Sequence, residues 1–225
     1  MNNLKPNYQR AKNAIILIWI MLGLEIISFV SGYFQYRLLQ TIAKGGEISM
    51  TAARMNDMRE KIIGIIYLLT YIVSAVIFIQ WFRRAYFNLH QKVEHLSYSE
   101  GMAAGCWFIP FVNLYRPYQI MRELYRETRL INSIDYNSKT TRYINWWWGL
   151  WITNGVFGQI IFRTSLKAKS IEALINTTTI SMIGNIVGLI LSLITIKVIK
   201  DYAKLESLLF EVKEEVTTQD KLILP

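Results

Sequence analysis

The sequence predicts an all-α integral membrane protein with four transmembrane helices. Three observations support this fold class: 52% of the 225 residues are hydrophobic, only 18% are charged, and the apolar residues form long uninterrupted blocks. Average soluble domains carry about 25% charged residues. A helix that crosses a bilayer needs about 20 consecutive apolar residues, and the blocks approach or exceed that length.

Each apolar block is interpreted as one membrane span. The first contains a single charged residue, Glu25, and is too long for the core of a cleaved signal peptide, which is about 7–15 residues. The second and fourth contain no charge, and the third is the shortest. The predicted spans are residues 14–34, 62–82, 146–162 and 173–196.

A fifth apolar stretch, residues 101–115, decides the predicted topology. It is short and is interrupted by Pro110, which favours an interfacial or re-entrant segment over a span. If it does not cross, 17 Lys and Arg residues lie in the cytoplasm and 8 lie outside; if it crosses, the numbers become 9 and 16. Because basic residues are retained on the cytoplasmic side, we expect four spans with both termini in the cytoplasm.

The segment between the second and third spans carries two motifs. The first, W-x-x-R-A-x-x-N, begins at Trp81, and the second, W-F-I-P-x-x-N-L-x-x-P-x-x-x-M-x-E, runs from Trp107 to Glu123. Together they resemble a family of bacterial four-span membrane proteins that is known only as a domain of unknown function. The resemblance implies a four-span fold in the bacterial inner membrane and supplies no activity, with the likeness extending over roughly residues 14–196.

The same segment gives the first set of candidate site residues. The two prolines bias the chain away from helix, so we predict a hydrogen-bonded interfacial hairpin in which the two asparagines bond backbone groups, in preference to a substrate site. The arginines are predicted at headgroup level, where they bind lipid phosphate or pair with Glu123. The candidates are Arg84, Asn88, Trp107, Pro110, Asn113, Arg116, Pro117 and Glu123.

An amphipathic helix is predicted after Pro117, completing an interfacial region over residues 101–133. Apolar residues recur at helical spacing from Tyr118 to Ile131, and we expect this face on the inner leaflet. Glu123 and Arg126 are predicted to pair on the opposite, exposed face. The tryptophans at the ends of spans two and three are interpreted as an aromatic belt at the membrane interface.

Polar residues inside the spans give the second set of candidates. A charge at the depth of Glu25 costs at least about 2.5–3.5 kcal/mol on insertion scales, so its side chain is predicted to face the bundle interior. Its predicted neighbours are Asn154, Gln159 and Asn185. Two interpretations stay open: an interhelical hydrogen bond that holds the bundle together, or a pathway for protons or cations.

The fourth span is predicted to continue into the cytoplasm. Its Gly184, Gly188 and Ser192 recur every four residues, which allows close packing against another span. A heptad-like seam from Val198 to Val216 then predicts a helix that packs on the protein itself or on a second copy. The predicted domains are residues 1–199, the transmembrane domain, and 200–225, a cytoplasmic helix and tail.

Other ligands find little support in the sequence. The single cysteine, Cys106, and the pair His90 and His95 do not form a metal-binding pattern, and no cofactor motif is present. The net charge of +9 is distributed among the ends of the apolar blocks, which indicates contact with anionic lipid headgroups and argues against nucleic acid. A homo-oligomer is compatible with the small-residue and heptad patterns, and no protein partner is indicated.

The sequence leaves three function classes in order of preference. The first is a non-enzymatic membrane scaffold, accessory or lipid-contacting protein. The second is an oligomeric channel or transporter for protons, ions or small solutes that uses Glu25. The third is an unfamiliar intramembrane enzyme. This class comes last because no known catalytic motif is present.

Overall fold

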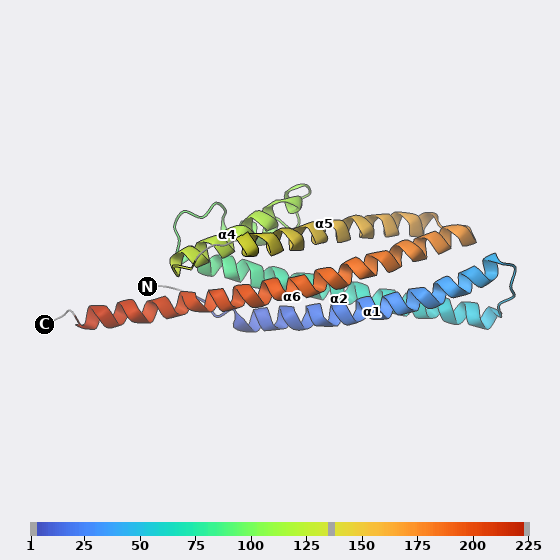
Figure 1. Ribbon diagram of the computed structural model, residues 1–225, viewed down its shortest axis with the longest axis horizontal. Helices are drawn as coiled ribbons and strands as arrows, with labels where there is room; N and C mark the ends of the chain where they lie inside the picture. The colour runs from blue at the N-terminus through green and yellow to red at the C-terminus, as the bar shows by residue number, and fades with distance from the viewer. Residues whose placement is uncertain (1–3, 135–137, 223–225) are drawn as a thin grey trace. The chain divides into compact units, whose positions relative to one another are not determined.

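The computed structural model describes residues 4–134 and 138–222, with side chains for residues 4–134 and 141–210. Over these ranges the chain is helical and contains no strand (Figure 1). The predicted all-α class is therefore confirmed. The helices are α1 (Tyr8–Ala43), α2 (Met50–His90), α3 (Glu100–Gly105), the 3₁₀ turn η1 (Val112–Leu114), α4 (Arg116–Ile131), α5 (Ser138–Lys167) and α6 (Ile171–Leu222).

Three of these helices are long and apolar enough to cross a bilayer by themselves. The most apolar windows of α1, α2 and α6 have mean hydropathies of 2.4, 2.6 and 2.2. The described part of α5 contains the predicted span 146–162 but does not reach this hydropathy. Three candidate membrane-spanning helices are thus found, and the fourth span stays a prediction.

Internal contacts divide the chain into two compact units. The first unit comprises Met1–Ile16, Ala75–Trp148 and Ile196–Pro225; the second comprises Leu17–Ser74 and Gly149–Thr195. The boundaries fall inside α1, α2, α5 and α6, so each of these helices contributes residues to both units. The predicted domain boundary between residues 199 and 200 is not tested by this division.

The second unit turns apolar side chains outward and polar ones inward. Ile65, Leu68 and Leu69 of α2 are exposed, whereas Glu25, Ser31 and Thr178 are buried. Such a surface is unfavourable in water. A bilayer covers the apolar side chains and requires polar groups to form hydrogen bonds inside the bundle.

Small residues allow the helices of the second unit to approach closely. A Cβ atom at Gly184 would lie 3.2 Å from Ile161 of α5, and one at Gly32 would lie 3.1 Å from Met182 of α6. Gly188 faces Glu25 of α1. The predicted use of the small-residue pattern in packing against other spans of the same chain is therefore confirmed.

Aromatic side chains form the core of the first unit. Trp81, Phe82 and Trp147 are almost fully buried. The ring of Phe78 lies 5.4 Å from that of Trp81, and Trp81 in turn meets Tyr202 at 6.1 Å. The predicted tryptophan belt is thus wrong for Trp81, Trp147 and Trp148, which pack within the protein; Trp146, 63% exposed, is available to the membrane interface.

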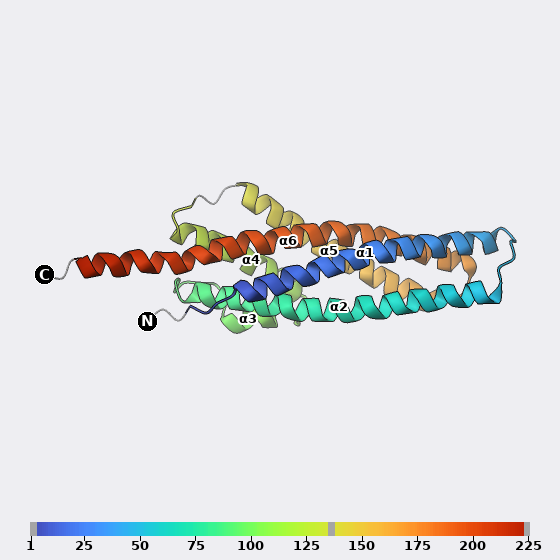
Figure 2. The same ribbon diagram turned by 90° about the horizontal axis from the view of Figure 1, so that it is seen from below.

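Helix α4 packs on α6 within the first unit (Figure 2). The Tyr125 hydroxyl donates to the carbonyl of Val198 at 2.6 Å, and the Thr128 and Tyr202 hydroxyls are 3.4 Å apart. The buried side of α4 is therefore covered by protein and not by the inner leaflet, contrary to the prediction.

The seam at the end of α6 is also used within the chain. Val198, Tyr202 and Leu209 are fully buried, and Leu205 is nearly so. Of the two alternatives left open by the sequence, packing on the protein itself is the one observed for these residues. The remaining seam positions, Val212 and Val216, lie outside the described side chains.

The aromatic core predicts a large difference between two neighbouring tryptophan substitutions. We expect Trp147→Ala to destabilise the protein by about 3–5 kcal/mol, the range for removal of a buried aromatic side chain. Trp146→Ala removes an exposed ring and should change stability by less than about 0.5 kcal/mol. Thermal unfolding in detergent measures both, and equal effects would contradict the assigned core.

Candidate functional site

A cavity of about 450 Å³ lies within the second unit, and both apolar and polar residues line it. It is partly open and is lined by the parts of α1, α2, α5 and α6 that belong to this unit. Its polar lining residues, drawn from all four helices, are Glu25, Ser28, Gln35, Glu60, Tyr67, Asn154, Ser165, Thr177, Thr178, Ser181 and Asn185. Such a volume is comparable to that of a small-molecule site.

Glu25 is the central group of this cavity. Its side chain is only 4% exposed, and the Tyr67 hydroxyl donates a hydrogen bond of 2.6 Å to its Oε1 atom. The residue facing it on α6 is Gly188, where a Cβ atom would collide with the carboxyl group. Glycine at this position therefore leaves the space that the Glu25 carboxyl occupies.

The structure brings together most of the predicted neighbours of Glu25. Asn154 of α5 and Asn185 of α6 line the same cavity. Gln159 does not line it and is exposed, so this member of the predicted set is not part of the site.

Sequence reasoning missed Tyr67 and Glu60. Tyr67 lies in an uncharged span and was not distinguished from its apolar neighbours, although its hydroxyl was a usable signal. Glu60 lies just before the predicted start of span two at residue 62, whereas α2 already begins at Met50.

Glu60, which lines the cavity, belongs to a second polar cluster. The Arg59 side chain donates to the Ser31 hydroxyl at 2.8 Å and to Asn56 Oδ1 at 2.7 Å, and it pairs with Glu60 at 3.3 Å. The Ser31 hydroxyl donates to Glu60 in turn. These contacts hold the Glu60 carboxylate in place at the cavity.

The lining defines what the cavity can hold. It offers two carboxyl groups together with hydroxyl and amide groups, which accept hydrogen bonds from a bound molecule or coordinate a cation through oxygen. Carboxylates repel anions, and the many hydrogen-bonding groups disfavour a purely apolar guest. The chemistry therefore favours a small cation or a polar, hydrogen-bond-donating solute.

The motif residue Asn88 forms a buried network in the first unit. Its side chain donates to Lys5 O at 2.8 Å and to Glu206 Oε1 at 2.7 Å, and it accepts from Lys5 N at 2.9 Å. Asn7 donates to the other Glu206 oxygen at 2.9 Å. Asn88 therefore bonds backbone groups, as predicted, but those of the N-terminal segment.

Glu123 is buried, and its partners differ from the predicted ones. Tyr86 donates to Oε2 at 2.6 Å, and the Ser97 hydroxyl and amide donate to Oε1 at 2.8 and 3.0 Å. Within the described residues neither Arg84 nor Arg116 pairs with it. The predicted exposed pair with Arg126 is also wrong, because Arg126 pairs with Glu127 at 2.7 Å.

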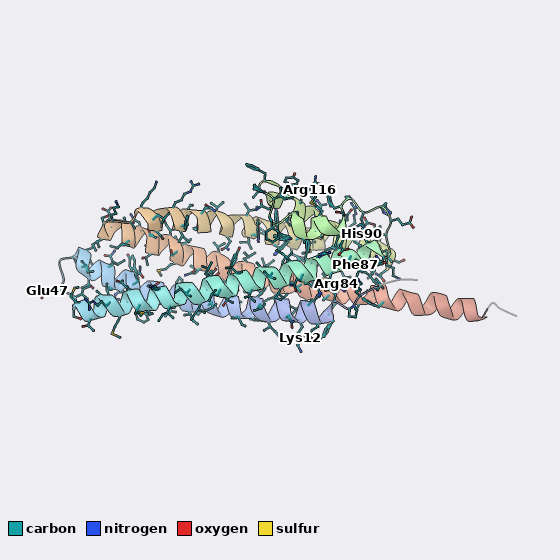
Figure 3. The ribbon with its side chains drawn as sticks, turned by 180° about the vertical axis from the view of Figure 1, so that it is seen from behind. Lys12, Glu47, Arg84, Phe87, His90 and Arg116 are labelled. Atoms are coloured by element: carbon teal, nitrogen blue, oxygen red, sulfur yellow. The ribbon has the colours of Figure 1, made fainter. Side chains whose placement is uncertain are left out.

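The two predicted arginines lie apart from Glu123 and contact aromatic rings. The guanidinium group of Arg84 is 5.8 Å from the centre of the Phe87 ring (Figure 3). That of Arg116 is 4.5 Å from the centre of the Tyr98 ring. Both side chains are partly exposed. Their binding to lipid phosphate stays a prediction.

The remaining candidates in this segment shape the chain. Pro117 occupies the first turn of α4, where the lack of an amide hydrogen has no cost. Pro110 lies in the turn before η1, and its carbonyl accepts from Val112 N at 2.8 Å. Asn113 contributes its backbone amide to Ile109 O at 3.0 Å. The indole of Trp107 packs 5.8 Å from the Phe82 ring.

The two histidines make polar contacts within the protein, and the cysteine is buried. His90 Nε2 lies 2.8 Å from Tyr98 O, and the exposed His95 is 3.7 Å from Glu127. Among the described residues no group of three His, Cys, Asp or Glu side chains is placed to hold a metal ion. Burial raises the pKa of the Cys106 thiol to about 11.

The three apolar spanning helices and the polar interior of the second unit define a multi-pass helical membrane protein. The chain belongs to the DUF4328 family, a domain of unknown function, whose profile matches residues 44–204. The match covers both motifs and begins after α1, which carries Glu25. No curated protein and no solved structure matches the chain.

The network around Glu206 predicts a graded response to two substitutions. Glu206→Ala leaves the buried Asn7 and Asn88 donors without their acceptor, and we expect a loss of about 1–3 kcal/mol in stability. Glu206→Gln keeps one acceptor oxygen and should lose less. Thermal unfolding of both variants in detergent measures the difference; an unchanged midpoint in Glu206→Ala would contradict the network.

The buried thiol predicts slow alkylation of Cys106. With a pKa near 11 the thiolate, which is the reactive form, is scarce at pH 8, and the side chain is covered by protein. Iodoacetamide should therefore modify the folded protein far more slowly than the protein unfolded in SDS, as followed by mass spectrometry. Rapid complete modification of the folded protein would show that the assigned burial is wrong.

Proposed function

We propose that this protein binds a small cation, such as a metal cation or a protonated amine, in the cavity of the second unit and mediates its movement across the membrane. The observation that carries this proposal is the position of Glu25, a buried carboxyl group in a polar cavity within otherwise apolar helices. A carboxyl group costs free energy at this depth, so it is retained there where it contributes to binding or conduction.

The proposed site has a division of roles. Glu25 provides the charge that attracts a cation, and the Tyr67 hydroxyl orients the carboxyl group through its 2.6 Å hydrogen bond. Asn154 and Asn185 offer amide oxygens to the same guest. Glu60, held by Arg59 and Ser31, adds a second carboxylate at the end of the cavity.

The proposed topology has four spans, with both termini in the cytoplasm of a bacterial cell and the spans in its inner membrane. Helix α5 has 30 residues, or about 45 Å at the usual rise, which is sufficient to cross the hydrocarbon layer. Part of its modest hydropathy is explained by Asn154, Gly158 and Ser165, which line the cavity. The excess of basic residues in the predicted cytoplasmic segments supports the orientation.

The second candidate is the scaffold or lipid-contacting role, and a different observation favours it. The motif residues Trp81, Asn88 and Glu123 build the interior of the first unit, which is a structural task. Basic side chains lie near them: Lys5 is 4.6 Å from the Phe87 ring, and Arg10 donates to Gln80 O at 3.1 Å. Such groups suit contact with anionic headgroups. Both candidates are non-enzymatic.

The cavity proposal predicts that cation binding depends on the Glu25 charge. We expect K⁺, Na⁺ or methylammonium to raise the unfolding temperature of the protein in nanodiscs, because a ligand that binds the folded state stabilises it. Glu25→Gln removes the negative charge that attracts a cation and should weaken the binding of the stabilising cation by about tenfold or more. For methylammonium, the hydrogen bond to a charged carboxylate alone contributes about 1.5–3 kcal/mol. Flux of the same cations into proteoliposomes measures transport.

Two glycine variants provide a matched pair for this experiment. Gly188→Ala places a methyl group against the Glu25 carboxyl and should weaken binding while leaving the charge unchanged. Gly155→Ala in α5 adds a methyl group in open space and should leave binding unchanged. If wild-type protein shows neither a shift nor flux with any of these cations, the proposal fails and the scaffold candidate is favoured.

A further inference from the structure

The loop between α3 and α4 exposes an unusual concentration of apolar side chains. Phe108 is 74% exposed and Phe111 is 80% exposed, and Ile109, Leu114 and Tyr115 are exposed as well. We call residues 108–115 the α3–α4 tip. An exposed apolar cluster of this kind indicates an interaction surface, because isolated apolar residues on a surface are common but contiguous groups are not.

Several backbone amides of the tip donate hydrogen bonds to carbonyl groups within it. Val112 N donates to Pro110 O at 2.8 Å, Asn113 N to Ile109 O at 3.0 Å and Leu114 N to Phe111 O at 3.1 Å. Phe111 has a φ of 64°, a left-handed conformation that bulky side chains rarely adopt. A closed turn of this kind can enter an apolar medium, where unsatisfied backbone groups are not tolerated.

The tip is fixed beside the ends of two predicted spans. The indole nitrogen of Trp148, near the start of the predicted third span, donates to Leu114 O at 3.0 Å. Trp107, which immediately precedes the tip, packs 5.6 Å from Phe78 near the end of the predicted second span. All of these residues belong to the first unit. The tip therefore lies at the depth where the spans leave the hydrocarbon layer.

A positive charge adjoins the apolar side chains. Arg116 directly follows the tip, and its guanidinium group lies over the rings of Tyr98 and Tyr115 at 4.5 and 5.2 Å. Within the described residues no carboxylate pairs with it. Apolar side chains next to an arginine and aromatic rings match the boundary between acyl chains and phosphates.

Helix α4 leads from the tip toward the part of α6 that follows the predicted span. Tyr118, in the first turn of α4, donates a hydrogen bond to Asn145 at 2.7 Å, whereas Thr128 near the end of the helix contacts Tyr202. Tyr202 lies six residues beyond the predicted end of span four at residue 196. The exposed Leu130, at the far end of α4, is therefore an apolar reference position away from the membrane.

We propose that the α3–α4 tip inserts Phe108 and Phe111 into the cytoplasmic leaflet of the protein's own bilayer and anchors the first unit to it. The occupant is lipid, because the apolar cluster is continuous with the span ends and flanked by Arg116. This decides between the alternatives left by the sequence: the segment is interfacial and not re-entrant. The inference rests on the first unit alone and is independent of the cavity proposal.

Depth-dependent quenching tests this anchor. The single native cysteine is replaced by Cys106→Ala, and Phe108→Cys, Phe111→Cys or Leu130→Cys is introduced separately and labelled with bimane. In proteoliposomes we expect strong quenching at positions 108 and 111 by lipids that carry a nitroxide near the glycerol end of the acyl chain, and weaker quenching by a nitroxide near the bilayer centre. The label at position 130 should be quenched by neither lipid nitroxide and should be quenched by aqueous iodide.

The controls separate misfolding from a wrong proposal. Each labelled variant must elute as a single species and unfold at a temperature close to that of Cys106→Ala, and a Tyr8→Cys label, exposed at the start of α1, serves as a second reference if Leu130→Cys fails to fold. Equal iodide quenching at positions 111 and 130 would overturn the proposal. Protection of positions 108 and 111 from both iodide and the lipid nitroxides, lost when the protein is diluted in lipid, would assign the tip to a contact with a second copy and would also overturn the proposal. Strongest quenching by the nitroxide at the bilayer centre would show that the segment is re-entrant, which would overturn it as well.

Discussion

The Glu25 carboxyl group is the constraint on which the arrangement of the second unit depends. A bilayer offers it no partner, so the bundle has to supply a hydrogen-bond donor and space. Tyr67 supplies the donor from α2, and Gly188 supplies the space on α6. Asn154 and Asn185 need hydrogen-bond partners for the same reason, and both line the cavity. The outer surface of the helices can then remain apolar.

Buried carboxyl groups with neutral donors recur through the molecule. Glu25 accepts a hydrogen bond from Tyr67, Glu123 accepts hydrogen bonds from Tyr86 and Ser97, and Glu206 accepts them from Asn7 and Asn88. Hydroxyl and amide donors orient a carboxyl group without an arginine or lysine that would also have to be buried. In the first unit these bonds join segments distant in sequence, such as the N-terminal segment and the end of α6. There they serve the fold, whereas the cavity around Glu25 leaves room for a guest.

Much of the fold could be predicted from the sequence, because hydropathy reports directly on membrane spans. Glu25 and its neighbours Asn154 and Asn185 were also accessible, since polar residues in a span must face inward. The partners of Glu123 were not, because helical spacing does not tell which of several charged side chains is buried. Trp81 and Trp147 were misjudged for a related reason: tryptophan suits both a membrane interface and an aromatic core, and only the packing distinguishes them.

The weak span signal of α5 follows from the same physics that forms the cavity. A helix that lends Asn154, Gly158 and Ser165 to a polar interior must lose mean hydropathy relative to one that meets only lipid. Helix α2, which contributes mainly Tyr67, Gly64 and Glu60 to the cavity from its first half, keeps the most apolar window of the three spanning helices. The low hydropathy of α5 is therefore an expected property of a helix that lines a polar site. Asn154 and Ser165 line the cavity, whereas Gln159 is exposed, so the cavity accounts for part of the polar character of this helix.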